Sequence, residues 1–178
     1  MSDFWTDTEV RRALGLGPEG QGAGEGKGRT GEGGERGGVA FAGISTDTRT
    51  IAEGALFVAL EGERFDAHEF LGQAAAAGAR GAVVARVPED APDGLVYYRV
   101  ADTLEALGQL ACHYRRSLDA RLCAVVGSNG KTTTKELARA TLGVRYRVHA
   151  TTGNLNNLIG APLTVLAAPR DAEVLVVE

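Results

Sequence analysis

The stretch with the clearest chemical potential is VVGSNGKTTT, residues 125–134, in which two glycines precede a lysine and three threonines. Gly127 and Gly130 allow main-chain N–H groups to turn toward a ligand without obstruction by side chains. A helix beginning near Lys131 would direct the positive end of its dipole at the same point. This arrangement is typical of a loop that binds phosphate groups.

Two side chains of the loop have distinct expected roles. Lys131 supplies a full positive charge for the β- and γ-phosphates of a nucleotide, and the Thr132 hydroxyl is placed to ligate Mg²⁺. The motif is the short form G-x-x-G-K-T, because Val125 stands where the longer phosphate-loop pattern has a glycine. An ordinary strand-to-helix turn with a solvated lysine is therefore the alternative.

Glu178 is a second candidate ligand for a metal ion. It follows the apolar run VLVV, residues 174–177, which reads as a buried strand. Ligands of open α/β sheets gather at the carboxyl ends of the strands, where a carboxylate can hold Mg²⁺ directly or through water. A solvated glutamate is the alternative.

The elements that must position these residues alternate regularly along the second part of the chain. We expect a buried strand at 121–127, a helix at 131–143, a strand at 146–151, a helix at 157–168 and a strand at 172–178. Such alternation predicts a parallel sheet with right-handed crossovers. The fold class is therefore α/β.

The first part of the chain predicts a smaller α/β unit. A short helix capped by Thr6 begins it, and we expect strands at 54–60, 81–87 and 94–100 and helices at 67–79 and 102–118. Residues 15–38 hold twelve glycines, so we expect a flexible insertion there. The predicted domains are residues 1–102 and 103–178.

Composition excludes several classes of protein. The net charge of −4 and the dispersed acidic residues argue against a nucleic-acid surface. No apolar run reaches the roughly 18 residues of a membrane span, and the polar start MSDFWTDTEV does not resemble a signal peptide. With two cysteines and no disulfide pattern, we expect a cytoplasmic protein without membrane insertion, which we interpret as a monomer.

Three segments of the sequence resemble the Mur ligases. VGSNGKTTTKE is similar to their ATP loop, with Val126 where the family usually has threonine. TTGNLNNLIGAPLTVL, residues 151–166, resembles a segment of the member that adds D-Ala-D-Ala. The stretch 45–79 resembles that member's N-terminal domain, with Thr48 in place of serine and Ala67 in place of glycine. The resemblance extends from about residue 43 to 178 and omits the glycine-rich insertion.

The resemblance implies a reaction and its partners. It implies an ATP-dependent ligase of peptidoglycan precursor synthesis, which joins D-Ala-D-Ala to UDP-N-acetylmuramoyl-tripeptide through an acyl phosphate. An N-terminal substrate domain would precede a P-loop-type parallel-sheet ATPase domain that is truncated here, and the family's C-terminal domain would be absent. The fragment alone is therefore expected to be inactive. The related ligase that adds the third peptide residue, a non-catalytic nucleotide-binding remnant and an unrelated P-loop kinase are the alternatives.

The resemblance also implies roles for individual residues. ATP would be bound by Gly127, Ser128, Asn129, Gly130, Lys131, Thr132 and Thr133. Mg²⁺ would be held by Thr132 and Glu178, and catalysis would involve Lys131, Asn154 and Asn157. The uridine diphosphate end of the substrate would meet Thr48 and Arg49. For the two asparagines, turn and helix-cap chemistry is the alternative. The motif also includes Asp47, Asp66 and His68, and for His68 we expect a structural role.

Overall fold

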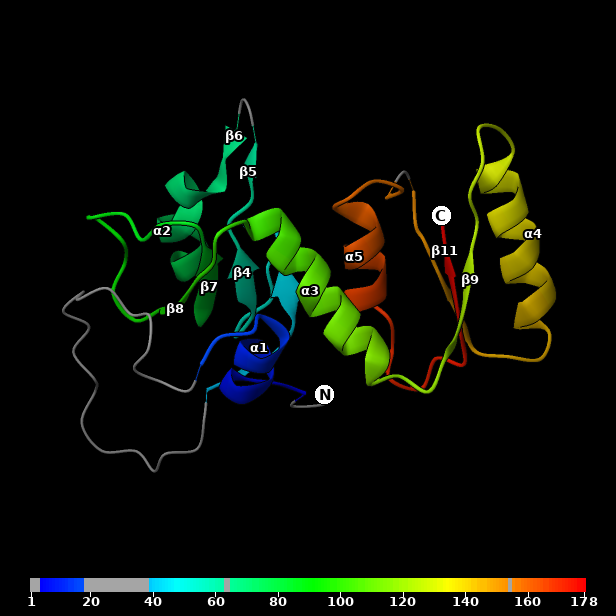
Figure 1. Cartoon of the computed structure of the whole chain (residues 1–178), viewed down its shortest axis with the longest axis horizontal. Coiled ribbons are helices and arrows are strands. Elements are labelled where there is room, and N and C mark those ends of the chain that lie inside the picture. Colours follow the sequence, from blue (N-terminus) through cyan, green and yellow to red (C-terminus); the bar gives the residue numbers. More distant parts are fainter. Residues whose placement is uncertain (1–3, 18–38, 63–64, 154) are drawn as a thin grey trace. The chain divides into compact units, whose positions relative to one another are not determined.

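A computed structural model describes residues 4–17, 39–62, 65–153 and 155–178 (Figure 1). The chain divides into two compact units, residues 1–106 and 107–178, and the division falls inside helix α3 (Thr103–Arg116). Beyond residue 17, the predicted flexible insertion at 15–38 lies outside the described residues. No helix in the described ranges is long and apolar enough to cross a membrane.

The first unit is built on a four-stranded parallel sheet. Its strands follow the order β3 (Ile44–Ser45), β4 (Leu56–Val58), β7 (Gly81–Val84) and β8 (Val96–Arg99). Every residue of β4 and β7 is buried, as expected for parallel strands covered on both faces. The three strands that the apolar runs predicted are confirmed, although each is shorter than its run.

Short elements surround this sheet. They are β1 (Trp5–Thr6) paired with β2 (Ala40–Phe41), α1 (Asp7–Ala13), the hairpin of β5 (Glu61–Gly62) and β6 (Phe65–Asp66), the 3₁₀ helix η1 (Ala67–Phe70) and α2 (Leu71–Ala76). The Thr6 hydroxyl accepts a hydrogen bond from the main-chain N–H of Glu9 at 3.3 Å, which confirms Thr6 as the cap of α1. The helix predicted at 67–79 is interrupted, because its first turn is 3₁₀ and is capped by Asp66.

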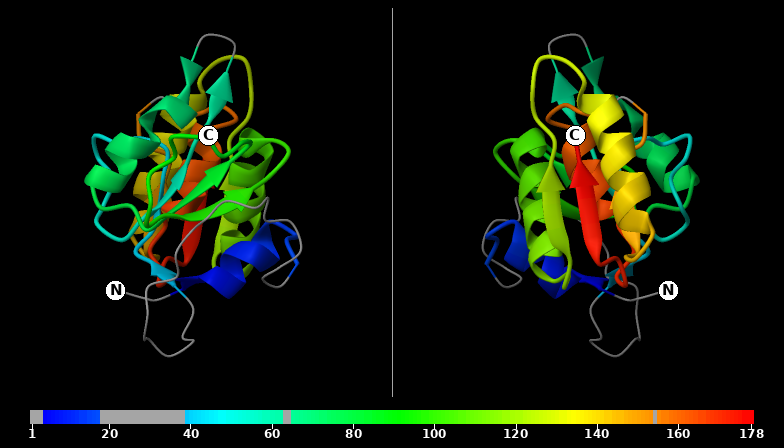
Figure 2. Two further views of the ribbon diagram at one scale, coloured as in Figure 1. Left: turned by 90° about the vertical axis from the view of Figure 1, so that its left-hand side faces the viewer. Right: turned by 90° about the vertical axis from the view of Figure 1, so that its right-hand side faces the viewer.

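The second unit contains the predicted alternation of strands and helices. Its elements are β9 (Arg121–Ala124), α4 (Lys131–Gly143), β10 (Val148–Ala150), α5 (Gly160–Leu166) and β11 (Val174–Val177). All three strands are parallel, in the order β10-β11-β9, so the parallel α/β prediction is confirmed. Figures 1 and 2 show α4 against one face of this sheet and α5 against the other.

The prediction that β9 is buried was wrong. Three of its four residues are exposed, and Leu122 is 50% exposed. The physical reason is its place at the edge of the sheet, where β11 is its one partner among the described strands. An apolar run therefore located the strand correctly but did not report its position within the sheet.

Candidate nucleotide and magnesium site

The phosphate-loop residues lie between the end of β9 and the start of α4. Gly130 precedes the helix with a φ of 72° and a ψ of 4°, a left-handed conformation that favours glycine. The first helical hydrogen bond runs from the N–H of Thr134 to the carbonyl of Gly130 at 2.9 Å. The N–H groups of Lys131, Thr132 and Thr133 therefore belong to the unpaired donors at the helix start.

These donors are accessible to a ligand. The loop residues Ser128 and Asn129 are exposed, and so are Thr132 and Thr133 in the first turn of α4, while Lys131 is half-buried. A helix start with free N–H groups and a nearby lysine attracts anions. The sequence-predicted loop residues are thus brought together in a geometry that suits phosphate.

Thr132 and Glu178 meet in front of this helix start. The Thr132 hydroxyl lies 3.2 Å from one carboxylate oxygen of Glu178 and 3.3 Å from the other. The two residues are 46 positions apart, and they meet because β11 pairs directly with β9 in the parallel sheet. The Glu178 side chain is only 2% exposed, so its carboxylate is held in place rather than solvated.

Three further residues surround Glu178, and sequence reasoning had not singled them out. The Lys135 ammonium lies 3.8 Å from a carboxylate oxygen, and the Asn156 side-chain amide donates to the other at 3.2 Å. The Glu178 main-chain N–H donates to the Thr151 hydroxyl at 3.0 Å. One signal could have identified Lys135, since it shares the inward face of α4 with Ala138 and Leu142 at spacings i, i+3 and i+7.

The two asparagines named from the sequence have different outcomes. The Asn157 side-chain oxygen accepts from the main-chain N–H groups of Ile159 at 3.1 Å and Gly160 at 2.7 Å. Bonds from a side-chain oxygen to the N–H groups two and three residues later are the turn chemistry that the sequence analysis gave as an alternative to a catalytic role. Asn154 lies outside the described residues.

The residues named for the uridine diphosphate end follow β3, at the carboxyl edge of the first unit's parallel sheet. Arg49, whose side chain is 85% exposed, donates to the Asp47 carboxylate at 2.9 and 2.6 Å. This hydrogen bonding lowers the pKa of Asp47 to about 2. Thr48 is half-buried beside this pair. The exposed guanidinium is available to an anion that displaces Asp47.

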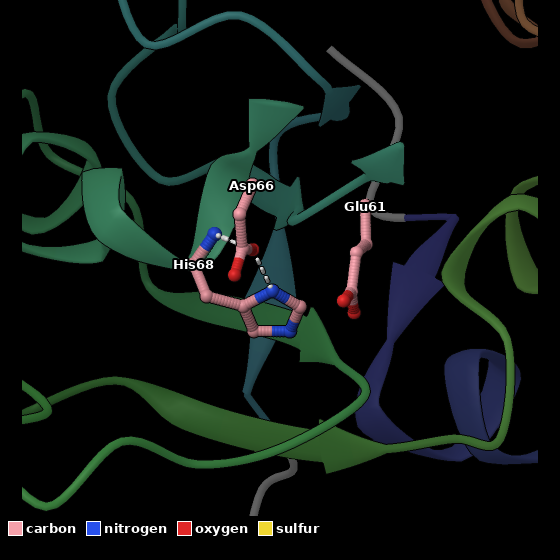
Figure 3. A group of neighbouring side chains, drawn as sticks. All are labelled: Glu61, Asp66 and His68. Atoms are coloured by element: carbon pink, nitrogen blue, oxygen red, sulfur yellow. Dashed lines mark hydrogen bonds and ion pairs between the residues drawn. The ribbon is translucent and has the colours of Figure 1, made fainter. Parts of the chain in front are cut away.

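A second cluster at this edge joins Glu61, Asp66 and His68 (Figure 3). The His68 ring is buried, and its Nε2 accepts from the N–H of Ala85 at 3.0 Å, which leaves Nδ1 to donate to Asp66 at 2.5 Å. Arg86 pairs with both carboxylates. Burial alone would raise the pKa of Asp66, but the hydrogen bonds from His68 and Arg86 outweigh it and lower that pKa.

This cluster suits a structural role better than a metal site. Both ring nitrogens of His68 are engaged within the protein, so neither offers a lone pair to a metal ion. The Arg86 guanidinium also occupies the position beside the carboxylates that a cation would take.

Comparison with known proteins supports one family along most of the chain. The model described as "Mur ligase family, catalytic domain" matches residues 40–115, and the model described as "Mur ligase middle domain" matches residues 125–178. A UDP-N-acetylmuramoyl-tripeptide–D-alanyl-D-alanine ligase of Bacillus subtilis (strain 168) is 49% identical over 136 residues, which cover 76% of this chain and 30% of the relative.

Solved structures agree with these matches. A crystal structure of MurF from Acinetobacter baumannii aligns with a TM-score of 0.77 and 34% identity, over 98% of this chain and 35% of that one. MurF from Thermotoga maritima, solved in complex with ADP, aligns with a TM-score of 0.67 and 32% identity, over 76% of this chain and 31% of that one. The chain spans about a third of the length of its relatives, and it belongs to the Mur ligase family, as a homologue of the N-terminal domain and the start of the middle domain of MurF.

Proposed function

We propose that the second unit binds ATP through the loop at residues 127–133 and that Thr132 and Glu178 hold Mg²⁺. The observation that carries this proposal is the meeting of the Thr132 hydroxyl with the buried Glu178 carboxylate at the start of α4. The ADP complex of the Thermotoga maritima relative supports a nucleotide as the ligand.

The residues present fit a magnesium ion. A hydroxyl and a carboxylate offer the hard oxygen ligands that Mg²⁺ prefers, and one or two protein ligands suffice because the ion retains water and phosphate oxygens. Thr132 and Glu178 would supply those two ligands. Bound Mg²⁺ would neutralise charge that develops on the β- and γ-phosphate oxygens.

We also propose that the chain is the N-terminal portion of a ligase that adds D-Ala-D-Ala to UDP-N-acetylmuramoyl-tripeptide. In that reaction the tripeptide carboxylate attacks the γ-phosphate of ATP, and an acyl phosphate forms as ADP leaves. The dipeptide amine then attacks the acyl carbon and inorganic phosphate departs. Lys131 and the N–H groups at the start of α4 would orient the phosphates and stabilise their charge.

The first unit would hold the substrate's uridine diphosphate end at Thr48 and Arg49. An arginine offers a planar donor fork that matches phosphate, and a threonine hydroxyl adds a donor beside it. Arg49 would exchange its bond to Asp47 for one to a phosphate oxygen. Calorimetric titration of the UDP-linked substrate against the wild type and Arg49→Ala tests this role, and equal affinities would remove Arg49 from the site.

The chain by itself is expected to bind ATP weakly and to form no amide bond. It covers 30% of the Bacillus subtilis relative, and we expect residues outside the matched segment to position the dipeptide. Loss of positioning alone can forfeit about 7–11 kcal/mol of barrier reduction. If a ligase that contains this segment forms no amide bond, the alternative function is a non-catalytic nucleotide-binding module.

A chimera tests the ligase function. Residues 43–178 replace the matching segment of the Bacillus subtilis ligase, and phosphate release is measured with ATP, Mg²⁺, UDP-N-acetylmuramoyl-tripeptide and D-Ala-D-Ala. We expect dipeptide-dependent release by the chimera and its loss in the Lys131→Ala chimera. A folded chimera that binds both substrates without dipeptide-dependent release would contradict the proposal. Such release by the 178-residue chain alone would contradict the expectation that it is inactive.

A further inference from the structure

Lys135 lies on the face of helix α4 that packs against the sheet, where an apolar residue is expected. Lys135 has a 2% exposed side chain, and its neighbours on the same face, Ala138 and Leu142, pack against the core of the sheet. Lysine is almost never fully buried unless its charge is paired, because burial removes the hydration of the ammonium group. The position therefore requires a specific partner.

The partners of Lys135 lie at the ends of two neighbouring strands. Its ammonium donates to the main-chain carbonyl of Thr151, just after β10, at 2.8 Å. It also lies 3.8 Å from the carboxylate of Glu178, which follows β11. Its third contact, Glu136 at 3.2 Å, is a half-exposed side chain that already pairs with Arg139 at 2.9 Å.

Glu178 depends on this ammonium for its charge balance. Its carboxylate accepts hydrogen bonds from Thr132 and Asn156, both of which are neutral. Among the described residues, Lys135 is the one cationic side chain within 4.0 Å of that carboxylate. A buried carboxylate without a counter-charge is costly, and it would move or recruit water.

We infer that Lys135 is a positioning residue for the magnesium site: it balances the charge of Glu178, keeps its carboxylate aimed at Thr132 before a metal ion binds, and ties the ends of β10 and β11 to α4. This inference rests on the proposed function, because it assigns Glu178 and Thr132 to Mg²⁺. Lys135 touches neither the phosphates nor the metal in this role, and it acts through Glu178.

The first test needs no metal and no nucleotide. Lys135→Met is compared with Arg139→Met, a matched control one turn along the same helix with a 57% exposed side chain. In ¹H–¹⁵N spectra of the metal-free chain, Lys135→Met should shift the Asn156 side-chain amide and the Glu178 main-chain amide. Arg139→Met should leave both in place. Unchanged resonances in folded Lys135→Met would overturn the inference.

The second test measures how the chain binds ADP with and without Mg²⁺. We expect Lys135→Met to reduce the magnesium-dependent gain in ADP affinity by about tenfold or more, and Lys135→Arg to retain most of it. In the Glu178→Gln background, Lys135→Met should change the affinity for ADP in the presence of Mg²⁺ by less than about threefold. The reason is that the effect of Lys135 depends on the Glu178 carboxylate, which this background already lacks.

An equal tenfold loss in the two backgrounds would show that Lys135 acts independently of Glu178, and it would overturn the inference. If the wild type shows no magnesium-dependent binding of ADP, the proposed function fails, and the metal-free spectra still decide whether Lys135 positions Glu178. Should Lys135→Met not fold, Lys135→Gln removes the charge, keeps a donor and is judged by the same outcomes.

Discussion

Replacement of Thr151 by valine isolates a single hydrogen bond at the candidate site. The Thr151 hydroxyl accepts from the main-chain N–H of Glu178 at 3.0 Å, and the residue is buried. Valine has nearly the same shape, so the substitution opens no cavity and leaves the backbone contacts of Thr151 intact. One of these is the bond from its N–H to the carbonyl of Val176 at 2.9 Å.

The expected cost follows from the group that loses its partner. A donor left unsatisfied away from water costs about 1–3 kcal/mol, whereas an average hydrogen bond contributes about 1 kcal/mol net. Burial of one additional methyl group in place of the hydroxyl returns up to about 0.8 kcal/mol. We therefore expect Thr151→Val to lower the free energy of unfolding by about 1–2 kcal/mol.

Urea unfolding followed by far-ultraviolet circular dichroism measures this loss, and Thr152→Val is the matched control. Thr152 is the exposed next residue, so its substitution should stay within about 0.5 kcal/mol of the wild type. Hydrogen exchange at the Glu178 amide should accelerate in Thr151→Val alone. Equal stabilities and equal exchange rates for the two variants would refute the assignment of this hydrogen bond.

Three further predictions address other parts of the fold. Arg49→Ala should raise the pKa of Asp47 from about 2 toward 3.8, as measured by carboxyl ¹³C shifts, and a pKa that stays near 2 would show that Arg49 is not the cause. Gly160→Ala should lower the free energy of unfolding in urea by at least about 2 kcal/mol, because a Cβ there would lie 2.4 Å from backbone atoms of Leu155. Gly143→Ala is the control, since a Cβ at that position meets nothing within 4 Å. Similar stabilities of the two variants would contradict this packing. The pKa of Asp66 is lowered in the folded state, so its stabilising effect is present above the ordinary value of 3.8 and is lost as pH falls through the folded pKa. Asp66→Asn should therefore destabilise the chain at pH 7 and much less at about pH 2, and an equal effect at both would exclude an ionic origin.

Local patterns predicted most of the second unit. The loop is identified by its glycines and Lys131, and the strands are identified by their apolar runs. Both signals consist of residues that are neighbours in sequence. The position of Glu178 followed from a topological rule, since the carboxyl ends of parallel strands share one edge of the sheet. The structure places it against Thr132 as that rule required.

What the sequence could not provide depends on tertiary position. The exposure of β9 follows from its place at the sheet edge, which its own residues do not encode. The sequence analysis chose Asn154 and Asn157 for the site, yet Asn156 donates to Glu178. The Asn157 side chain instead accepts from main-chain N–H groups just before and at the start of α5. Lys135 resembles a surface lysine in a polar helix until its burial and partners are known.

The nucleotide site at the start of α4 is tested most directly by titrating the ¹⁵N-labelled chain with ADP and Mg²⁺ and following the amide shifts. We expect weak binding that shifts the amides of residues 127–133 and Glu178. Lys131→Ala should weaken it by at least about tenfold, because a charge-assisted contact to phosphate is lost. Absence of binding, shifts confined to other parts of the chain, or equal affinity in Lys131→Ala would contradict a nucleotide site at the start of α4.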